Sequence, residues 1–195
     1  MKKLLYIHGL ASTRNSNTVW NLRKHVDWEV CAFDVPFDPE QAAGFVREES
    51  GKYDMVIGSS LGGFYAQFAD RSVPRILINP ALHAADSIKR ISGYGTYEYF
   101  GPREDGVDTF TTTPEYYEGL HELESKLYGD AGFDGWVNEE ARANTRVILG
   151  RQDETLGEYN WGLVRELYGE DHITYVDMLH QVSEECVRDV IRGML

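Results

Sequence analysis

Ser60 lies at the centre of a Gly-x-Ser-x-Gly frame that can expose a nucleophilic hydroxyl, Gly58-Ser59-Ser60-Leu61-Gly62. Residues 53–57, which are apolar except for Asp54, predict a short buried strand before it, and residues 61–69 have the character of a helix. A serine on a sharp turn from a strand into a helix presents its Oγ to a substrate. Glycines suit so tight a turn, because neighbouring side chains would clash across it. The frame alone arises often by chance, but its position between a strand and a helix predicts a serine nucleophile.

The nucleophile needs a base, because a serine hydroxyl reacts poorly at neutral pH unless a histidine takes its proton and a carboxylate orients that histidine. For a nucleophile on this kind of turn, the partners follow in the chain order serine, acid, histidine. Of the six histidines, only His172 and His180 come late enough to follow an acid. His172 begins the last predicted strand, at the wrong end of the sheet, whereas His180 follows the end of that strand. We therefore expect His180 to be the base.

Asp153 is the predicted acid, because it follows the predicted strand 145–150 after a short loop. Two other carboxylates stay open as alternatives: Glu154 is adjacent, and Asp177 is near His180 in the sequence. Asn79 follows the preceding strand, where some serine hydrolases carry their acid instead. An amide cannot stabilise an imidazolium through a charge, so we expect Asn79 to make a structural hydrogen bond.

Two backbone N–H groups are candidates for binding an oxyanion. Leu61 opens the predicted helix, so its N–H has no partner within that helix. The loop His8-Gly9-Leu10 follows the first predicted strand, and Gly9 allows it to turn tightly. We expect the N–H of Leu10 to face that of Leu61, so that both donate to the charge that develops on a carbonyl oxygen. We expect His8 to hold this loop rather than to transfer a proton.

Apolar runs that alternate with helical patterns place these residues at the ends of strands. The predicted strands are residues 3–7, 29–35, 53–57, 74–80, 145–150 and 173–178. This alternation predicts one α/β domain over residues 1–195, with a six-stranded, mostly parallel sheet and helices on both faces. Ligands of such sheets bind beyond the carboxyl ends of the strands. Those ends carry the residues named above, His8, Ser60, Asn79, Asp153 and His180.

Residues 82–143 interrupt the alternation and are interpreted as a cap-like insertion over one end of the sheet. Thr113 and Pro114 predict the start of a helix that runs to about Tyr128. The segment 93–102 is rich in glycine and tyrosine. The aromatic residues within 94–100 could form a wall of an acyl pocket or could pack a small cap, and we favour packing.

Charge and composition exclude several classes of partner. The chain has 195 residues with Lys+Arg 19 against Asp+Glu 32, a net charge of −13. This charge repels nucleic acids and anionic membranes, so we expect neither as a partner. The two cysteines, Cys31 and Cys186, suggest neither a disulfide scaffold nor a metal site. The first apolar run is too short for a signal peptide, and no run is long enough to span a membrane, so we expect a cytoplasmic protein.

Three segments of the chain together resemble the YqiA/YcfP-like family of small bacterial esterases in the α/β-hydrolase superfamily. The resemblance is close over roughly residues 1–80 and looser around residues 150–156 and 178–180. The segments that carry it are Leu4–Leu10, Ile57–Ala66 and Leu77–Ala81.

This resemblance implies a cytosolic hydrolase of carboxylic esters or thioesters that uses neither a metal nor a cofactor. By motif position it also implies that Ser60, Asp153 and His180 form the triad. The chain departs from the family at Met178-Leu179, where the family has small or polar residues before the histidine.

Our hypothesis from the sequence is a serine hydrolase that cleaves a small-molecule carboxylic ester, or a thioester, through an acyl-enzyme on Ser60. The alternative is an α/β-hydrolase-like binding or regulatory protein with weak or no catalysis. Labelling by a fluorophosphonate separates the two, because an inert fold does not react. The sequence predicts neither the acyl chain, nor the leaving group, nor the oligomeric state.

Overall fold

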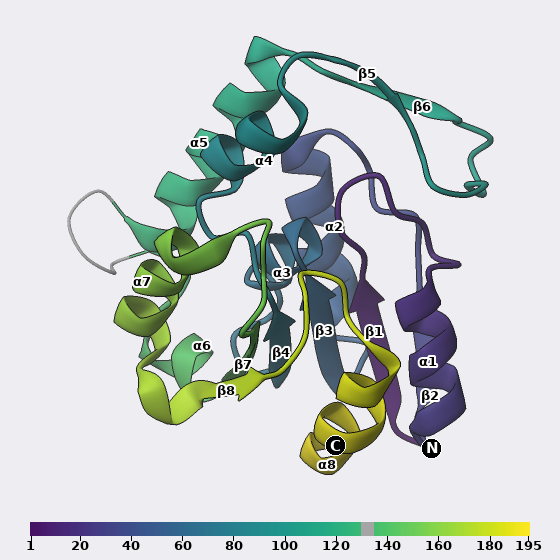
Figure 1. Cartoon of the computed structure of the whole chain (residues 1–195), viewed down its shortest axis with the longest axis vertical. Coiled ribbons are helices and arrows are strands. Elements are labelled where there is room, and N and C mark those ends of the chain that lie inside the picture. Colours follow the sequence, from purple (N-terminus) through teal and green to yellow (C-terminus); the bar gives the residue numbers. More distant parts are fainter. Residues whose placement is uncertain (130–134) are drawn as a thin grey trace.

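A six-stranded sheet forms the centre of the computed structural model, which describes residues 1–129 and 135–195 (Figure 1). The remaining residues, 130–134, belong to the predicted insertion and lie outside the described residues. The strand order is β2-β1-β3-β4-β7-β8, and every neighbouring pair is parallel. The predicted six-stranded α/β sheet is therefore confirmed. The strands are β1 (Lys3–Ile7), β2 (Glu29–Ala32), β3 (Met55–Ser59), β4 (Arg75–Ile78), β7 (Thr145–Gly150) and β8 (Ile173–Val176).

Successive residues of the strands enter two hydrophobic cores, one on each face of the sheet, because side chains of a strand alternate between its faces. In β1, Leu5 and Ile7 join one core, whereas Leu4 and Tyr6 join the other. Both faces of the sheet are thus buried, which explains why the strands appear in the sequence as continuous apolar runs.

Helices cover both cores, as the sequence predicts. The face of Leu4 packs against α1 (Asn17–His25) and a C-terminal π-helical stretch (Cys186–Ile191) that continues as α8 (Arg192–Met194). The face of Leu5 is covered by helices whose buried residues share its core: α2 (Pro39–Ser50), α3 (Leu61–Ala66) and α7 (Gly157–Tyr168). A short 3-10 turn (Glu170–His172) leads into β8.

Most of the described part of the segment between β4 and β7 lies at the end of the sheet toward which the strand arrows point, whereas its last helix lies toward the opposite end (Figure 1). Its described elements are α4 (Ala84–Ser92), β5 (Gly95–Glu98), β6 (Thr109–Thr112), α5 (Pro114–Tyr128) and α6 (Glu139–Ala143). The helix predicted over residues 114–128 is confirmed as α5, and Thr113 caps it by accepting a hydrogen bond from the N–H of Tyr116.

The antiparallel hairpin of β5 and β6 was not predicted, because the sequence indicates no strand in this segment. The strands are only four residues long, and in β6 just Phe110 and Thr112 are buried. So short a pair carries too little alternating hydrophobicity to be recognised, and the pairing of the two strands with each other defines it. Within the described residues, no helix combines the length and the apolar character needed to cross a membrane.

Candidate active site

Ser60 lies on a strained turn between β3 and α3, with φ of 54° and ψ of −124°. A positive φ is unfavourable for a residue with a side chain, and strained residues of this kind concentrate at functional sites. The turn needs its glycines because a Cβ on Gly62 would lie 2.2 Å from the carbonyl oxygen of Ile7. A Cβ on Gly58 would lie 2.3 Å from the carbonyl oxygen of Gly62. Helix α3 therefore lies so close to β1 and β3 that only glycine fits at these two positions.

The structure brings Ser60, His180 and Asp153 into one chain of hydrogen bonds. His180 Nε2 lies 3.0 Å from Ser60 Oγ. On the other side of the ring, His180 Nδ1 lies 3.0 Å from Asp153 Oδ1 and 3.1 Å from Oδ2. The tautomer that fits both contacts carries its proton on Nδ1, donates it to the carboxylate and accepts from the serine hydroxyl. In this tautomer the imidazole can take the Ser60 proton.

The Asp153 carboxylate is fully buried and held by backbone donors. Its side chain has no exposed surface, and its Oδ1 accepts hydrogen bonds from the N–H groups of Thr155 at 2.9 Å and Leu156 at 3.0 Å. Burial raises the pKa of this carboxyl, but the hydrogen bonds from His180, Leu156 and Thr155 outweigh it and leave the pKa below the ordinary 3.8. Asp153 is therefore ionised at neutral pH and can stabilise a positive imidazolium.

The other two carboxylates do not reach the imidazole among the hydrogen bonds of the described residues. Glu154 accepts from the backbone N–H of His180 at 3.3 Å, so it contacts the loop rather than the ring. Asp177 accepts from the side-chain amide of Gln152 at 2.7 Å. Of the three acids that the sequence leaves open, the geometry favours Asp153.

Asn79, at the end of β4, connects the loop of the base to the strand of the acid. Its side-chain nitrogen donates to the carbonyl oxygens of Leu179 at 3.1 Å and His180 at 2.9 Å. Its side-chain oxygen accepts from the N–H of Gly150, the last residue of β7, at 2.7 Å. The predicted structural hydrogen bond is confirmed, but its consequence for the position of His180 was not visible in the sequence.

His8 engages the backbone with both ring nitrogens. Nδ1 donates to the carbonyl of Gly9 at 2.9 Å, and Nε2 accepts from the N–H of Val35 at 3.1 Å. Burial lowers the pKa of this histidine, which keeps the ring neutral, as the acceptor role of Nε2 requires. As expected, His8 holds the loop that carries Leu10.

Leu10 and Leu61 line the same small cavity, whose volume is about 30 Å³. The N–H of Leu10 has no acceptor among the described residues. Two backbone donors beside one cavity next to a serine are what an oxyanion hole requires.

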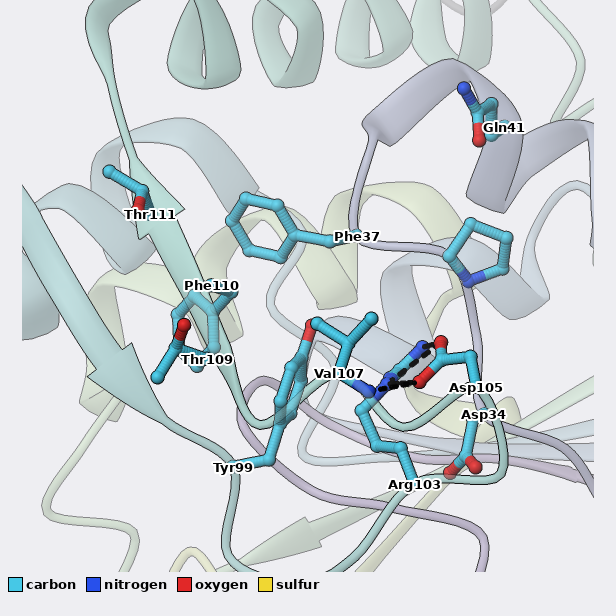
Figure 2. Close-up of a pocket in the computed structure, with 11 residues that line it drawn as sticks. Asp34, Phe37, Gln41, Tyr99, Arg103, Asp105, Val107, Thr109, Phe110 and Thr111 are labelled. Carbon is cyan, nitrogen blue, oxygen red and sulfur yellow. Dashed lines mark hydrogen bonds and ion pairs between the residues drawn. The ribbon is translucent and has the colours of Figure 1, made fainter.

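A larger cavity of about 550 Å³ lies between the segment after β2 and the hairpin (Figure 2). Figure 2 shows the rings of Phe37, Tyr99 and Phe110 grouped together, with the ion pair of Arg103 and Asp105 beside them. The ring centroid of Phe110 lies 4.9 Å from that of Phe37 and 5.0 Å from that of Tyr99. Arg103 also donates to the carbonyl of Val35, so this cation already has partners.

Sequence reasoning missed part of this lining. Tyr99 belongs to the tyrosine-rich segment for which we favoured packing, yet it lines both cavities. Tyr94 and Phe100 are 58% and 84% exposed, and they line neither cavity. Packing within the insertion is nevertheless present, because the ring centroid of Tyr94 lies 5.7 Å from that of Tyr117 and the ring centroid of Tyr97 lies 5.7 Å from that of Phe110.

The chain also matches a known family. Residues 3–161 match the model of the family described as "Uncharacterised protein family (UPF0227)", which is the YqiA/YcfP family. The chain belongs to this family. The resemblance seen in the first segments of the sequence is thereby confirmed.

Solved structures of hydrolases share the fold at low sequence identity. The monoacylglycerol lipase of Paleococcus ferrophilus is 15% identical with a TM-score of 0.58, over 98% of this chain and 91% of the lipase. Est1E from Butyrivibrio proteoclasticus is 14% identical with a TM-score of 0.61, over 99% of this chain and 86% of Est1E. The esterase domain of a Rhodothermus marinus protein is 13% identical with a TM-score of 0.59, over 99% and 84%. These similarities show that the chain has the α/β-hydrolase fold.

Proposed function

We propose that this protein is a serine hydrolase that cleaves a small-molecule carboxylic ester through an acyl-enzyme on Ser60. The observation that carries the proposal is the unbroken path of hydrogen bonds from Ser60 Oγ through the His180 ring to the buried Asp153. Membership of a family of α/β-hydrolase fold supports it, as does the fold that the chain shares with esterases and lipases. Within the single domain, the segment 82–143 acts as a cap over the site.

The reaction has two steps. Ser60 Oγ attacks the ester carbonyl carbon, His180 Nε2 takes the hydroxyl proton, and Asp153 stabilises the resulting imidazolium. The bond from the carbonyl carbon to the leaving alcohol breaks, and His180 returns the proton to that alcohol. A water molecule then attacks the acyl-enzyme with His180 again as base, releasing the acid and restoring Ser60.

The N–H groups of Leu10 and Leu61 hold the negative oxygen of each tetrahedral intermediate. Their position on the lining of one cavity supports this role. Loss of one such donor typically costs about 2.7–4 kcal/mol of transition-state stabilisation. The hydrogen bonds of His8 to Gly9 and Val35 keep the Leu10 loop in place.

Fluorophosphonate labelling tests the proposal most directly. We expect the wild-type protein to be labelled on Ser60 and to hydrolyse 4-nitrophenyl acetate, and we expect Ser60→Ala to lose both. Ser59→Ala is the matched control, because Ser59 lies in the same turn but its hydroxyl contacts the Tyr6 hydroxyl at 2.6 Å rather than the imidazole. If labelling persists in Ser60→Ala and is lost in Ser59→Ala, the nucleophile is Ser59 and not Ser60. A wild type that neither labels nor hydrolyses esters would support the binding-protein alternative.

A further inference from the structure

Three tyrosines line the small cavity beside the proposed oxyanion donors, and two of them are buried: Tyr65 from α3 and Tyr116 from α5. Tyr65 lies one helical turn after Leu61, and Tyr116 stacks on Phe37 with ring centroids 4.4 Å apart. Both side chains are nearly inaccessible, with 3% and 5% of their surface exposed. The nucleophile helix and the inserted segment therefore meet at this cavity.

The hydroxyls of these tyrosines are buried without a hydrogen-bond partner. In the described part of the chain, four buried side-chain polar atoms lack a partner, and two of them are Tyr65 Oη and Tyr116 Oη. Tyrosines elsewhere in the interior are bonded: Tyr128 donates to Leu82, and Tyr168 donates to Gln67. An unpaired buried hydroxyl is unfavourable, and two of them belong to residues that line one cavity, which favours a ligand that supplies the missing partner.

The two hydroxyls are near neighbours. Burial raises the pKa of each, and each also affects the pKa of the other, although their geometry does not meet that of a hydrogen bond. Both groups therefore keep their protons at neutral pH. Each can donate a hydrogen bond to an oxygen that enters the cavity and can accept one in return.

The cavity belongs to the acyl side of the site. The leaving alcohol must receive its proton from His180, so it lies on the side of that histidine. Among the described residues that line the cavity, none comes from the loop that carries His180. The group that enters the cavity is therefore attached to the carbonyl carbon and remains on Ser60 after the alcohol leaves.

We propose that the Tyr65 and Tyr116 hydroxyls bind an oxygen atom carried by the acyl group close to the ester carbonyl, so that the enzyme prefers alkoxyacyl and hydroxyacyl esters to plain alkyl esters. This inference rests on the proposed function. The small cavity, at about 30 Å³, has room for a few atoms, which places the oxygen within the first atoms of the acyl chain. Pro36, Phe37 and Tyr99 line both cavities, so a longer acyl group has the 550 Å³ cavity beyond.

A pair of substrates of equal size tests the preference. Methoxyacetate and butyrate esters of 4-nitrophenol differ by one oxygen in place of one methylene. We would measure kcat/KM for both and divide each by the rate of hydrolysis by hydroxide, which removes the greater intrinsic reactivity of the methoxyacetate. We expect the wild type to favour methoxyacetate by about tenfold or more, because a site built to hydrogen-bond an oxygen rejects the analogue that lacks it.

Removal of the hydroxyls should abolish this preference. We expect the double variant Tyr65→Phe, Tyr116→Phe to treat the two corrected esters equally and each single variant to lose part of the preference. Tyr94→Phe is the matched control, because Tyr94 is exposed and lines neither cavity; it should keep the full preference. The phenylalanine variants should melt no lower than the wild type, since the hydroxyls have no partner to lose.

Two results would overturn the inference in distinguishable ways. Wild-type protein that is labelled by a fluorophosphonate but shows equal corrected rates for both esters would refute the oxygen preference and leave the serine hydrolase standing. A lower melting temperature for the double variant with an unchanged preference would show that the hydroxyls only stabilise the fold. If the wild-type protein is neither labelled nor able to hydrolyse esters, both the proposed function and this inference are wrong.

Discussion

The side-chain amide of Asn79 donates to the backbone carbonyl of His180 at 2.9 Å, although the two residues are 101 positions apart. The same amide donates to Leu179, and its oxygen accepts from Gly150. Asn79 itself has a positive φ of 42°, which aims its side chain from the end of β4 across the end of β7. One buried side chain thus sets the spacing between the strand of the proposed acid and the loop of the proposed base.

We predict that Asn79→Ala lowers kcat for a small ester by about 10- to 100-fold, because a base displaced by as little as 1 Å from its reactive position costs about this much. KM should change little, since Asn79 does not line either cavity. The free energy of unfolding should fall by about 1–3 kcal/mol, because the Gly150 N–H and the two carbonyls lose their partner. Steady-state kinetics and urea unfolding measure both effects.

The exposed Asn15 provides the control for this prediction, and Asn15→Ala should change neither kcat nor stability. Asn79→Asp sharpens the test because a carboxylate keeps the size of the amide but cannot donate to two carbonyls. An Asn79→Asp variant with wild-type kcat would contradict a positioning role.

We predict that Asp153→Asn lowers kcat by about 10⁴-fold, because an amide neither orients the required tautomer nor stabilises the imidazolium. Asp177→Asn should retain most of the activity, since Asp177 contacts Gln152 and not the ring. Glu154→Gln should have a smaller effect than Asp153→Asn, because Glu154 accepts only from the backbone of His180. Measurement of kcat for the three variants would identify the acid, and a larger loss in Asp177→Asn would assign it elsewhere.

The low pKa of Asp153 has a consequence for acid stability. Hydrogen bonds that favour the carboxylate hold its pKa in the folded protein below the ordinary 3.8. The stabilisation is therefore fully present above the unfolded pKa and is lost as the pH falls through the folded pKa. We expect the difference in unfolding free energy between wild type and Asp153→Asn to be constant above about pH 5 and to shrink below about pH 4. Urea unfolding of both proteins between pH 7 and pH 3 would measure it, and a difference independent of pH would contradict this account.

Gly62 and Gly162 are both helical glycines, but only the first is confined. A Cβ on Gly62 would lie 2.2 Å from the carbonyl oxygen of Ile7 and 2.5 Å from that of His8, whereas nothing lies within 4 Å of a Cβ on Gly162. We predict that Gly62→Ala destabilises the protein by about 1–3 kcal/mol or more. It should also reduce ester hydrolysis, because it pushes the proposed nucleophile helix away from the Leu10 loop.

Gly162→Ala should instead stabilise the protein by about 0.5–1 kcal/mol and leave hydrolysis unchanged, because alanine favours an open helical position. Thermal or urea unfolding of the two variants gives the comparison. Equal effects of the two substitutions would show that the close contact between α3 and β1 does not constrain the turn.

The sheet and its helices could be predicted because their signals are local. In residues 3–7 and 145–150, every position that enters one of the two cores is apolar. Such a continuous apolar run can be recognised without knowing which strand lies beside it. The hairpin of β5 and β6 escaped prediction for the opposite reason. Its strands have four residues each, and they are defined by pairing with each other rather than by their own pattern.

The turn at Ser60 and the order of its candidate partners are recognisable from the sequence alone, because a tight turn imposes residue types on positions that are adjacent in the chain. Which acid meets His180 depends instead on the tertiary structure. Asp153, Glu154 and Asp177 all carry a carboxylate shortly after the end of a strand, and the contact with the ring depends on how β7 and β8 end.

The tertiary structure also places Asn79, Tyr65 and Tyr116 where the roles proposed for them are possible. Each of these side chains has neighbours that are distant in the sequence, which no local pattern records. Asn79 contacts a loop 101 residues away, and α3 and α5 bring the two tyrosines to one cavity. Hydrogen bonds and cavities depend on positions within a few tenths of an ångström, whereas sequence patterns report only which face of an element is buried. The chemistry of Ser60 can therefore be predicted from the sequence. The residues that surround it and would select its substrate cannot.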